Sequence, residues 1–108
     1  MNHDTAQAIY AALRDAAPPD LLRELILMAS RYAGLRVSWA MADMDGRRGL
    51  DGERTRAHNA FIDQCNILSR TMAKAGQDTS WRMEMGEERK EIGDFACHLA
   101  CRIGIQAR

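Results

Sequence analysis

The segment Arg54–Arg70, with the sequence RTRAHNAFIDQCNILSR, decides the fold because it separates into two faces when placed on a helix. One face is an apolar stripe at steps of three and four residues, which is typical of a helix packed on a core. This stripe consists of Ala57, Phe61, Cys65, Leu68 and Met72. The pattern predicts a long amphipathic helix from about Glu53 to Ala75, ended by Gly76.

The opposite face carries a second line of side chains, here called the polar stripe: Arg56, Asn59, Asp63, Asn66 and Arg70. Asn and Asp compete with the helix backbone for hydrogen bonds, so solvated helix faces usually favour Lys and Glu. Their presence here indicates selection for something besides helix formation, and ligand binding is one interpretation. A subunit interface is the second. The third is a solvated surface on which Asp63 bridges to both arginines.

The rest of the chain also predicts helices, and no segment predicts a strand. Helical spacing indicates helices at about Thr5–Ala17, Leu21–Met44 and Glu87–Ile103, with a short turn through Ser80–Met85. The glycine-rich, charged segment Asp45–Gly52 is predicted to be a loop. Because the connections are short, we expect an all-α fold: a compact bundle of about four helices with no sheet, forming a single domain over residues 1–108.

Composition restricts the partners. Lys plus Arg number 15 and Asp plus Glu number 15, so the net charge is zero. This balance argues against global attraction to a nucleic acid polymer or an anionic membrane.

The most apolar segment, Leu21–Met44, is interrupted by charged residues, and the N-terminus lacks the pattern of a secretory signal. We therefore expect a cytoplasmic protein with no membrane segment.

Arg36 is out of place on the apolar face of the Leu21–Met44 helix. A buried guanidinium must pair, reach solvent or face a polar cavity, because an uncompensated charge in a core is costly. Stacking on Tyr32 or Trp39 is one interpretation. An ion pair with Asp63, or with another acid of the Glu53–Ala75 helix, is the other.

The pattern gives little support for a metal or catalytic site. Cys65, Cys97, His98 and Cys101 lack the spacing of a structural zinc site, and buried free thiols are the expected alternative. His58 and His98 have acidic residues nearby but no evident nucleophile. We therefore predict no catalytic residue, no metal ion and no cofactor.

Three runs of the chain carry a resemblance: residues 54–63 with 66–70, the pair Trp81–Arg82, and residues 89–97 with the pattern RxxIGDFAC. Together they resemble a family of small bacterial and prophage-borne proteins described only as a domain of unknown function. The resemblance covers roughly the last half of the chain, while residues 1–50 match nothing in it. It implies a small helical protein carried by a phage or mobile element. By analogy, such proteins act by stoichiometric binding, against a defence protein or a nucleotide signal.

These observations predict a non-enzymatic, homo-oligomeric binding protein that sequesters an anionic, nucleotide-like molecule in a polar pocket. The predicted ligand-binding residues are Arg54, Arg56, Asn59, Asp63, Asn66, Arg70, Trp81 and Arg82. The arginines would contact phosphate, the Asn side chains sugar or base, and Trp81 would stack unless it packs into the core. Two alternatives stay open: a protein inhibitor or assembly module that uses the same helix face, and a small nuclease-like enzyme.

Overall fold

Five helices make up the part of the chain that the structure, a computed structural model, describes: residues 1–106. They are α1 (His3–Ala16), α2 (Pro19–Met41), α3 (Met44–Lys74), α4 (Ser80–Met85) and α5 (Arg89–Gln106). No strand occurs within these residues. The all-α prediction is confirmed, and the predicted turn before the last helix is the short helix α4.

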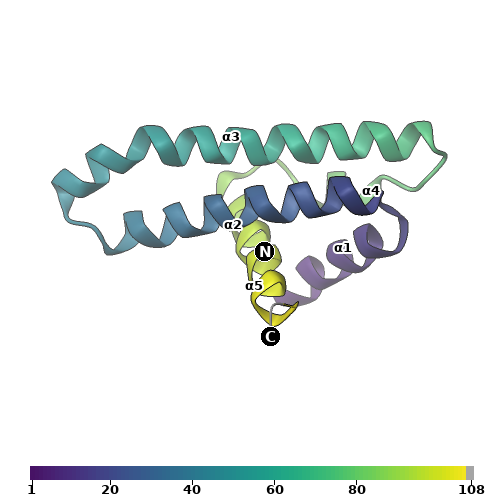
Figure 1. Ribbon diagram of the computed structural model, residues 1–108, viewed down its shortest axis with the longest axis horizontal. Helices are drawn as coiled ribbons and strands as arrows, with labels where there is room; N and C mark the ends of the chain where they lie inside the picture. Colours follow the sequence, from purple (N-terminus) through teal and green to yellow (C-terminus); the bar gives the residue numbers. More distant parts are fainter. Residues whose placement is uncertain (107–108) are drawn as a thin grey trace.

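The helices α2 and α3 form a long antiparallel hairpin, and α5 crosses α2 (Figure 1). The first half of α5 also reaches α3, where the rings of Phe95 and Phe61 are 6.3 Å apart. α1 and α4 lie on the same side of the hairpin as α5. The central position of α2, between α3 and α5, explains the breadth of its apolar face. Beyond the crossing with α5, the closed end of the hairpin extends alone, and the molecule is correspondingly elongated, with extents of 47 × 29 × 25 Å.

The buried side chains form one hydrophobic cluster to which all five helices contribute. The apolar stripe of α3 lies in it, since Phe61, Cys65 and Leu68 are fully buried. Large side chains from the other helices complete the cluster: Ile9, Leu13, Leu25, Tyr32, Trp81, Met85, Ile92, Phe95 and Leu99. Burial of this kind stabilises the fold by roughly 25 cal/mol per Å² of apolar surface removed from water.

The predicted loop Asp45–Gly52 is wrong, because these residues are helical and form the first turns of α3. Asp43 caps the helix by accepting a hydrogen bond from the Gly46 N–H at 2.8 Å. Trp39 of α2 holds the same turns: its indole N–H donates to Asp51 at 2.7 Å, and its ring lies 4.3 Å from the Arg47 guanidinium. These contacts across the hairpin outweigh the low helix propensity of glycine.

Glycines in a left-handed conformation end two of the helices. Gly76, with φ +76°, follows the last turn of α3, where the sequence predicts the helix to end. Gly86, with φ +71°, ends α4 and turns the chain toward α5. Gly34, by contrast, lies within an uninterrupted α2. Among residues 1–106, no helix is both long enough and apolar enough to cross a membrane.

Candidate functional site

The polar stripe lies along one face of α3, and most of its side chains reach solvent. Arg56, Asn59, Asp63 and Arg70 are exposed, while Asn66 is half-buried. Within the described chain, Asp63 makes no ion pair with either arginine of the stripe. The bridges from Asp63 to these arginines are therefore not formed, while the exposure of the side chains is that of a solvated face.

Asn66 and Arg82 come together, but in a contact that fastens α4 to α3. The Arg82 Nε donates to the Asn66 side-chain oxygen at 2.8 Å, and its other nitrogens donate to the Gly86 carbonyl and to Glu87. Arg82 is only 13% exposed. Trp81, beside Arg82, is 2% exposed and is packed in the core. Of the two interpretations of Trp81, stacking on a ligand or packing in the core, the structure shows the second.

Arg54 is separated from the rest of the predicted site by its contact with α2. Its guanidinium lies 4.1 Å from the centre of the Trp39 ring, close enough for a cation–π interaction. Its Nε is buried and has no hydrogen-bond partner in the described chain. The predicted ligand-binding residues are thus spread over α3 and α4 rather than gathered around one cavity, and Arg56 is the member that lines a cavity.

That cavity is a groove of about 310 Å³ between α2 and α3, here called the α2/α3 groove. Its floor is apolar, and a guanidinium group stands on each helix; the lining residues are Met28, Arg31, Arg56, Ala57 and Ala60. Neither arginine has an ion pair within residues 1–106. Leu27, Met28, Gly34 and Leu35 are the neighbours of Arg31 one turn away on α2, so no carboxylate is in reach there. Glu53, three residues before Arg56 on α3, is exposed and makes no ion pair with Arg56 in the described chain.

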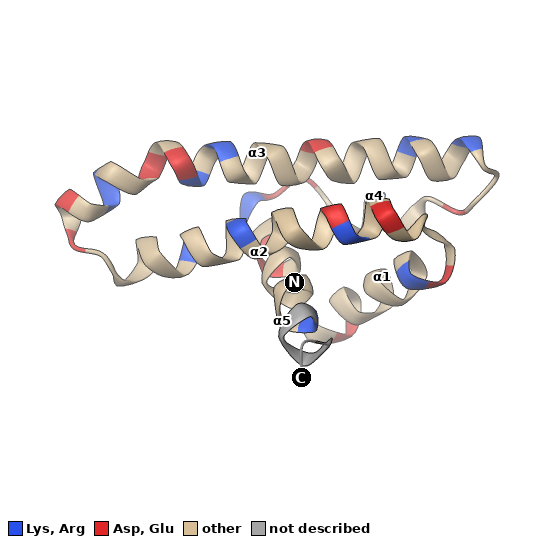
Figure 2. Cartoon of the chain, viewed as in Figure 1, with Lys and Arg blue, Asp and Glu red and all other residues tan. Residues whose placement is uncertain are grey.

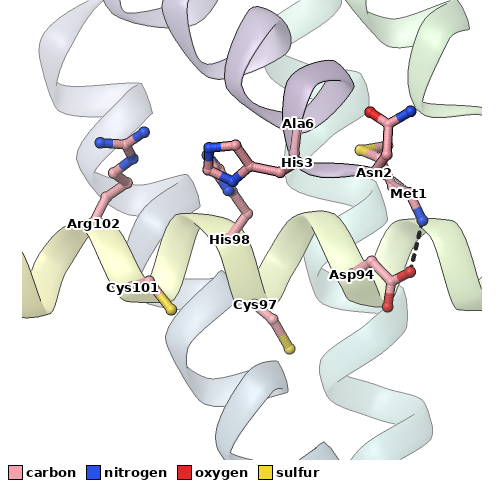
Figure 3. Close-up of a pocket in the computed structure, with 9 residues that line it drawn as sticks. All are labelled: Met1, Asn2, His3, Ala6, Asp94, Cys97, His98, Cys101 and Arg102. Atoms are coloured by element: carbon pink, nitrogen blue, oxygen red, sulfur yellow. Dashed lines mark hydrogen bonds and ion pairs between the residues drawn. The ribbon is translucent and has the colours of Figure 1, made fainter.

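A second cavity, of about 650 Å³, lies between the N-terminal turn of α1 and α5 and is here called the α1/α5 cavity (Figure 3). Figure 3 shows the His3 and His98 rings next to each other, with Arg102 one turn further along α5. The lining residues are Met1, Asn2, His3, Ala6, Asp94, Cys97, His98, Cys101 and Arg102. The two imidazole rings are 5.3 Å apart, centre to centre, and His98 Nε2 is 3.3 Å from the Gln7 side-chain oxygen.

Asp94 forms the charged end of the α1/α5 cavity. Its carboxylate accepts hydrogen bonds from the Met1 α-amino group at 2.7 Å and from Lys90 at 2.9 Å, and it pairs with Arg36 at 3.5 Å. Burial alone would raise the pKa of Asp94, but the hydrogen bonds from the α-amino group and Lys90 outweigh burial and hold the pKa at about 2.

The partner of Arg36 is therefore on α5, and the expectation of a pair with Asp63 or another acid of α3 is wrong. Arg36 also donates to the Cys97 sulfur at 3.3 Å. Gly93 makes this approach possible, since a Cβ there would lie 2.6 Å from the Arg36 Cζ. The sequence shows Arg36 to be unusual but cannot identify its partner, because the crossing of α2 by α5 is a tertiary feature.

The cysteines do not gather into a metal site. Cys65 is buried in the core, where burial raises its pKa to about 12, while Cys101 is exposed. No group of three metal-ligating side chains occurs in the described part of the chain. The His58 ring is in edge-to-face contact with the Tyr32 ring, at 5.3 Å between ring centres, and its Nδ1 contacts the Asn59 side-chain oxygen. Its surroundings are those of a packed interface between α2 and α3.

Comparisons with protein-family models, with curated proteins and with solved structures find no match. The resemblance of the second half of the chain to a family of unknown function stays a prediction. Side-chain chemistry at the two cavities is therefore the basis for a function. Sequence reasoning missed the contributions of His3, Arg31 and Arg102 to these cavities. A partial signal was available in the one-turn spacing of His98 and Arg102.

Proposed function

We propose that this protein is a non-enzymatic binding protein that holds a small anionic, nucleotide-like molecule in the α2/α3 groove. One observation carries the proposal: the guanidinium groups of Arg31 and Arg56 flank an apolar floor and have no carboxylate partner in the described chain. Arginine stays charged at all physiological pH values and binds phosphate through paired N–H groups. An anion between α2 and α3 would therefore satisfy both side chains together.

The floor of the α2/α3 groove suits the uncharged part of such a ligand. Met28 supplies a flexible, polarisable surface, and the small side chains of Ala57 and Ala60 leave room beside it. The volume of about 310 Å³ is at the lower end of the range for small-molecule pockets. A mononucleotide-sized ligand with its phosphate at the arginines and its base on Met28 fits this chemistry.

The lining of the α2/α3 groove favours sequestration over conversion of the ligand. It consists of two permanent cations and three apolar side chains, so it offers charge and contact area but no group that would exchange a proton near neutral pH. Stoichiometric removal of a nucleotide signal is the activity expected of a phage or mobile-element protein by the analogy above. The remaining stripe residues on this face, such as Asn59 and Asp63, stay predicted contacts for a larger ligand.

The test is a binding assay with cyclic and linear nucleotides, using thermal shift and then calorimetry. We expect at least one nucleotide to raise the melting temperature. We expect Arg31→Gln and Arg56→Gln each to weaken its binding by about tenfold or more, since a charge-assisted hydrogen bond is lost. Arg48→Gln is the matched control: this arginine is also exposed on α3 but lies outside the groove and outside the polar stripe.

Two outcomes would refute the proposal. One is the absence of binding across the nucleotide panel by folded protein. The other is an equal loss of affinity in the Arg56 and Arg48 variants, because that would indicate attraction by overall charge rather than by the groove.

A second candidate function, an assembly module, is favoured by the closed end of the hairpin. Met41 is 82% exposed and Met44 is 71% exposed, and they lie on either side of the connection between α2 and α3. Val37, one turn before Met41, is also exposed. We infer that this end of the hairpin, here called the hairpin tip, associates with a second copy of the chain, as the predicted homo-oligomer requires. Exposed apolar clusters of this kind mark interaction sites more often than isolated exposed side chains do.

A further inference from the structure

Three nitrogen-bearing side chains meet on one wall of the α1/α5 cavity without an acidic partner among them. His3 extends from α1 toward His98 of α5, and Arg102 lies one turn along α5 on the same side (Figure 3). His3 and His98 are in edge-to-face contact, at 5.3 Å between ring centres. Arg102 has no ion pair in the described chain and rests against the Tyr10 ring at 5.0 Å.

Titratable and polar groups face this wall from both helices. On α5, Asp94 is the acid one turn before His98, and it already contacts the Met1 α-amino group, Lys90 and Arg36. Cys97 and Cys101 are the thiols in the lining. On α1, Gln7 and Tyr10 face His98 along with His3. Asp94 and Glu91 are already paired with the Met1 α-amino group, Lys90 and Arg36, so these carboxylates are engaged away from the two imidazole rings.

We propose that the α1/α5 cavity is a second anion-binding site, which takes up a small dianion of the phosphate class beside His3, His98 and Arg102. Imidazole and guanidinium N–H groups on this wall are the donors that such an anion accepts from. The volume of about 650 Å³ accommodates a phosphate group with an organic substituent as well as the free ion. This site shares no residue with the α2/α3 groove and does not depend on the function proposed there.

The electrostatics of His98 supply the link between binding and pH. Burial first, and then the positive charges of Arg102 and His3, hold the pKa of His98 below its ordinary value. A bound dianion would offset the two positive neighbours and favour the protonated ring. Binding and protonation are thermodynamically reciprocal, so the dianion must raise the pKa of His98 and bind more tightly as the pH falls.

Sulfate is the probe of choice, because it stays a dianion over the pH range in which histidine titrates. The pKa values of the histidines are measured from their ring-proton NMR signals, with sulfate and with chloride at equal ionic strength, in the full chain. We expect sulfate to raise the pKa of His98 by about half a unit or more. His58 is the internal control, because it packs on Tyr32 away from this cavity and should not respond.

Variants separate this site from the α2/α3 groove. Arg102→Gln should abolish the effect of sulfate on His98, while Arg31→Gln, in the groove, should leave it intact. Retained folding of each variant is checked from its amide spectrum. The proposal is overturned if sulfate leaves the His98 pKa unchanged, or if the shift is the same in the Arg102 variant as in the wild type. A sulfate response that persists in Arg31→Gln supports it even where no nucleotide binds the groove.

Discussion

At the scale of single residues, Asp94 joins three segments of the chain. Its carboxylate contacts the N-terminal amino group, Lys90 of its own helix and Arg36 of α2. It is 27% exposed, so solvent weakens these interactions only in part. Since its pKa in the folded protein, about 2, is below the ordinary 3.8, the unfolded chain binds a proton more readily than the folded protein does. The stabilisation is therefore present above about pH 4 and is lost as the pH falls toward 2.

Asp94→Asn should lower the free energy of unfolding at pH 7 by roughly 1–2 kcal/mol and flatten its decline between pH 4 and 2. Urea denaturation followed by circular dichroism at several pH values measures both effects. Asp63→Asn is the control, because Asp63 is exposed and has no ion pair in the described residues. Equal losses in the two variants would mean that the Asp94 contacts contribute nothing specific.

At the scale of helices, features that follow from the spacing of apolar residues could be predicted from the sequence. Features that depend on contacts with another helix could not. The spacing of Phe61, Cys65 and Leu68 identified the buried face of α3, and Gly76 marked its end. The sequence predicts a loop at residues 45–52 because their glycines and charges are unfavourable in an isolated helix. What makes them helical is contact with Trp39 on the partner helix, which local propensity does not contain.

The candidate sites also combine features that follow from helical spacing with features that depend on contacts between helices. The sequence placed Arg56 on one face of α3, and that placement needs only helical spacing. It could not place Arg31 opposite Arg56, because that depends on the register between α2 and α3. The α1/α5 cavity could not be predicted from the sequence at all. Gln7 and His98 are in contact although they are 91 residues apart in the chain, and no local pattern predicts this contact.

The helical state of residues 45–52 is tested by a pair of glycine substitutions. Gly49→Ala should raise the free energy of unfolding by about 0.5–1 kcal/mol, because nothing lies within 4 Å of the new Cβ and alanine favours a helix. Gly93→Ala, also within a helix, should gain less or lose stability, because its Cβ would displace the Arg36 guanidinium from Asp94. Urea midpoints compare the two. Destabilisation by Gly49→Ala would show that this segment is not helical in solution.

At the scale of the whole molecule, the hairpin is longer than the helices packed against it. α5 meets α2 near Arg36, so the last turn of α2 and the first turns of α3 extend past the main core (Figure 1). Figure 2 shows that both signs of charge occur along this end of the hairpin. A second copy placed on this end across a two-fold axis would cover the exposed methionines of the tip.

Self-association through the hairpin tip can be measured by sedimentation velocity over a range of protein concentrations. We expect the wild type to form dimers and the double variant Met41→Ser, Met44→Ser to stay monomeric at the same concentrations, because the exposed apolar surface is removed. Met83→Ser is the matched control: Met83 is 86% exposed but lies on α4, away from the hairpin tip. If the wild type is monomeric throughout, or if the Met83 variant dissociates as readily as the double variant, the tip is not the interface. A helical spectrum unchanged in the double variant would confirm that the methionines act between molecules rather than within one, since neither is part of the buried core.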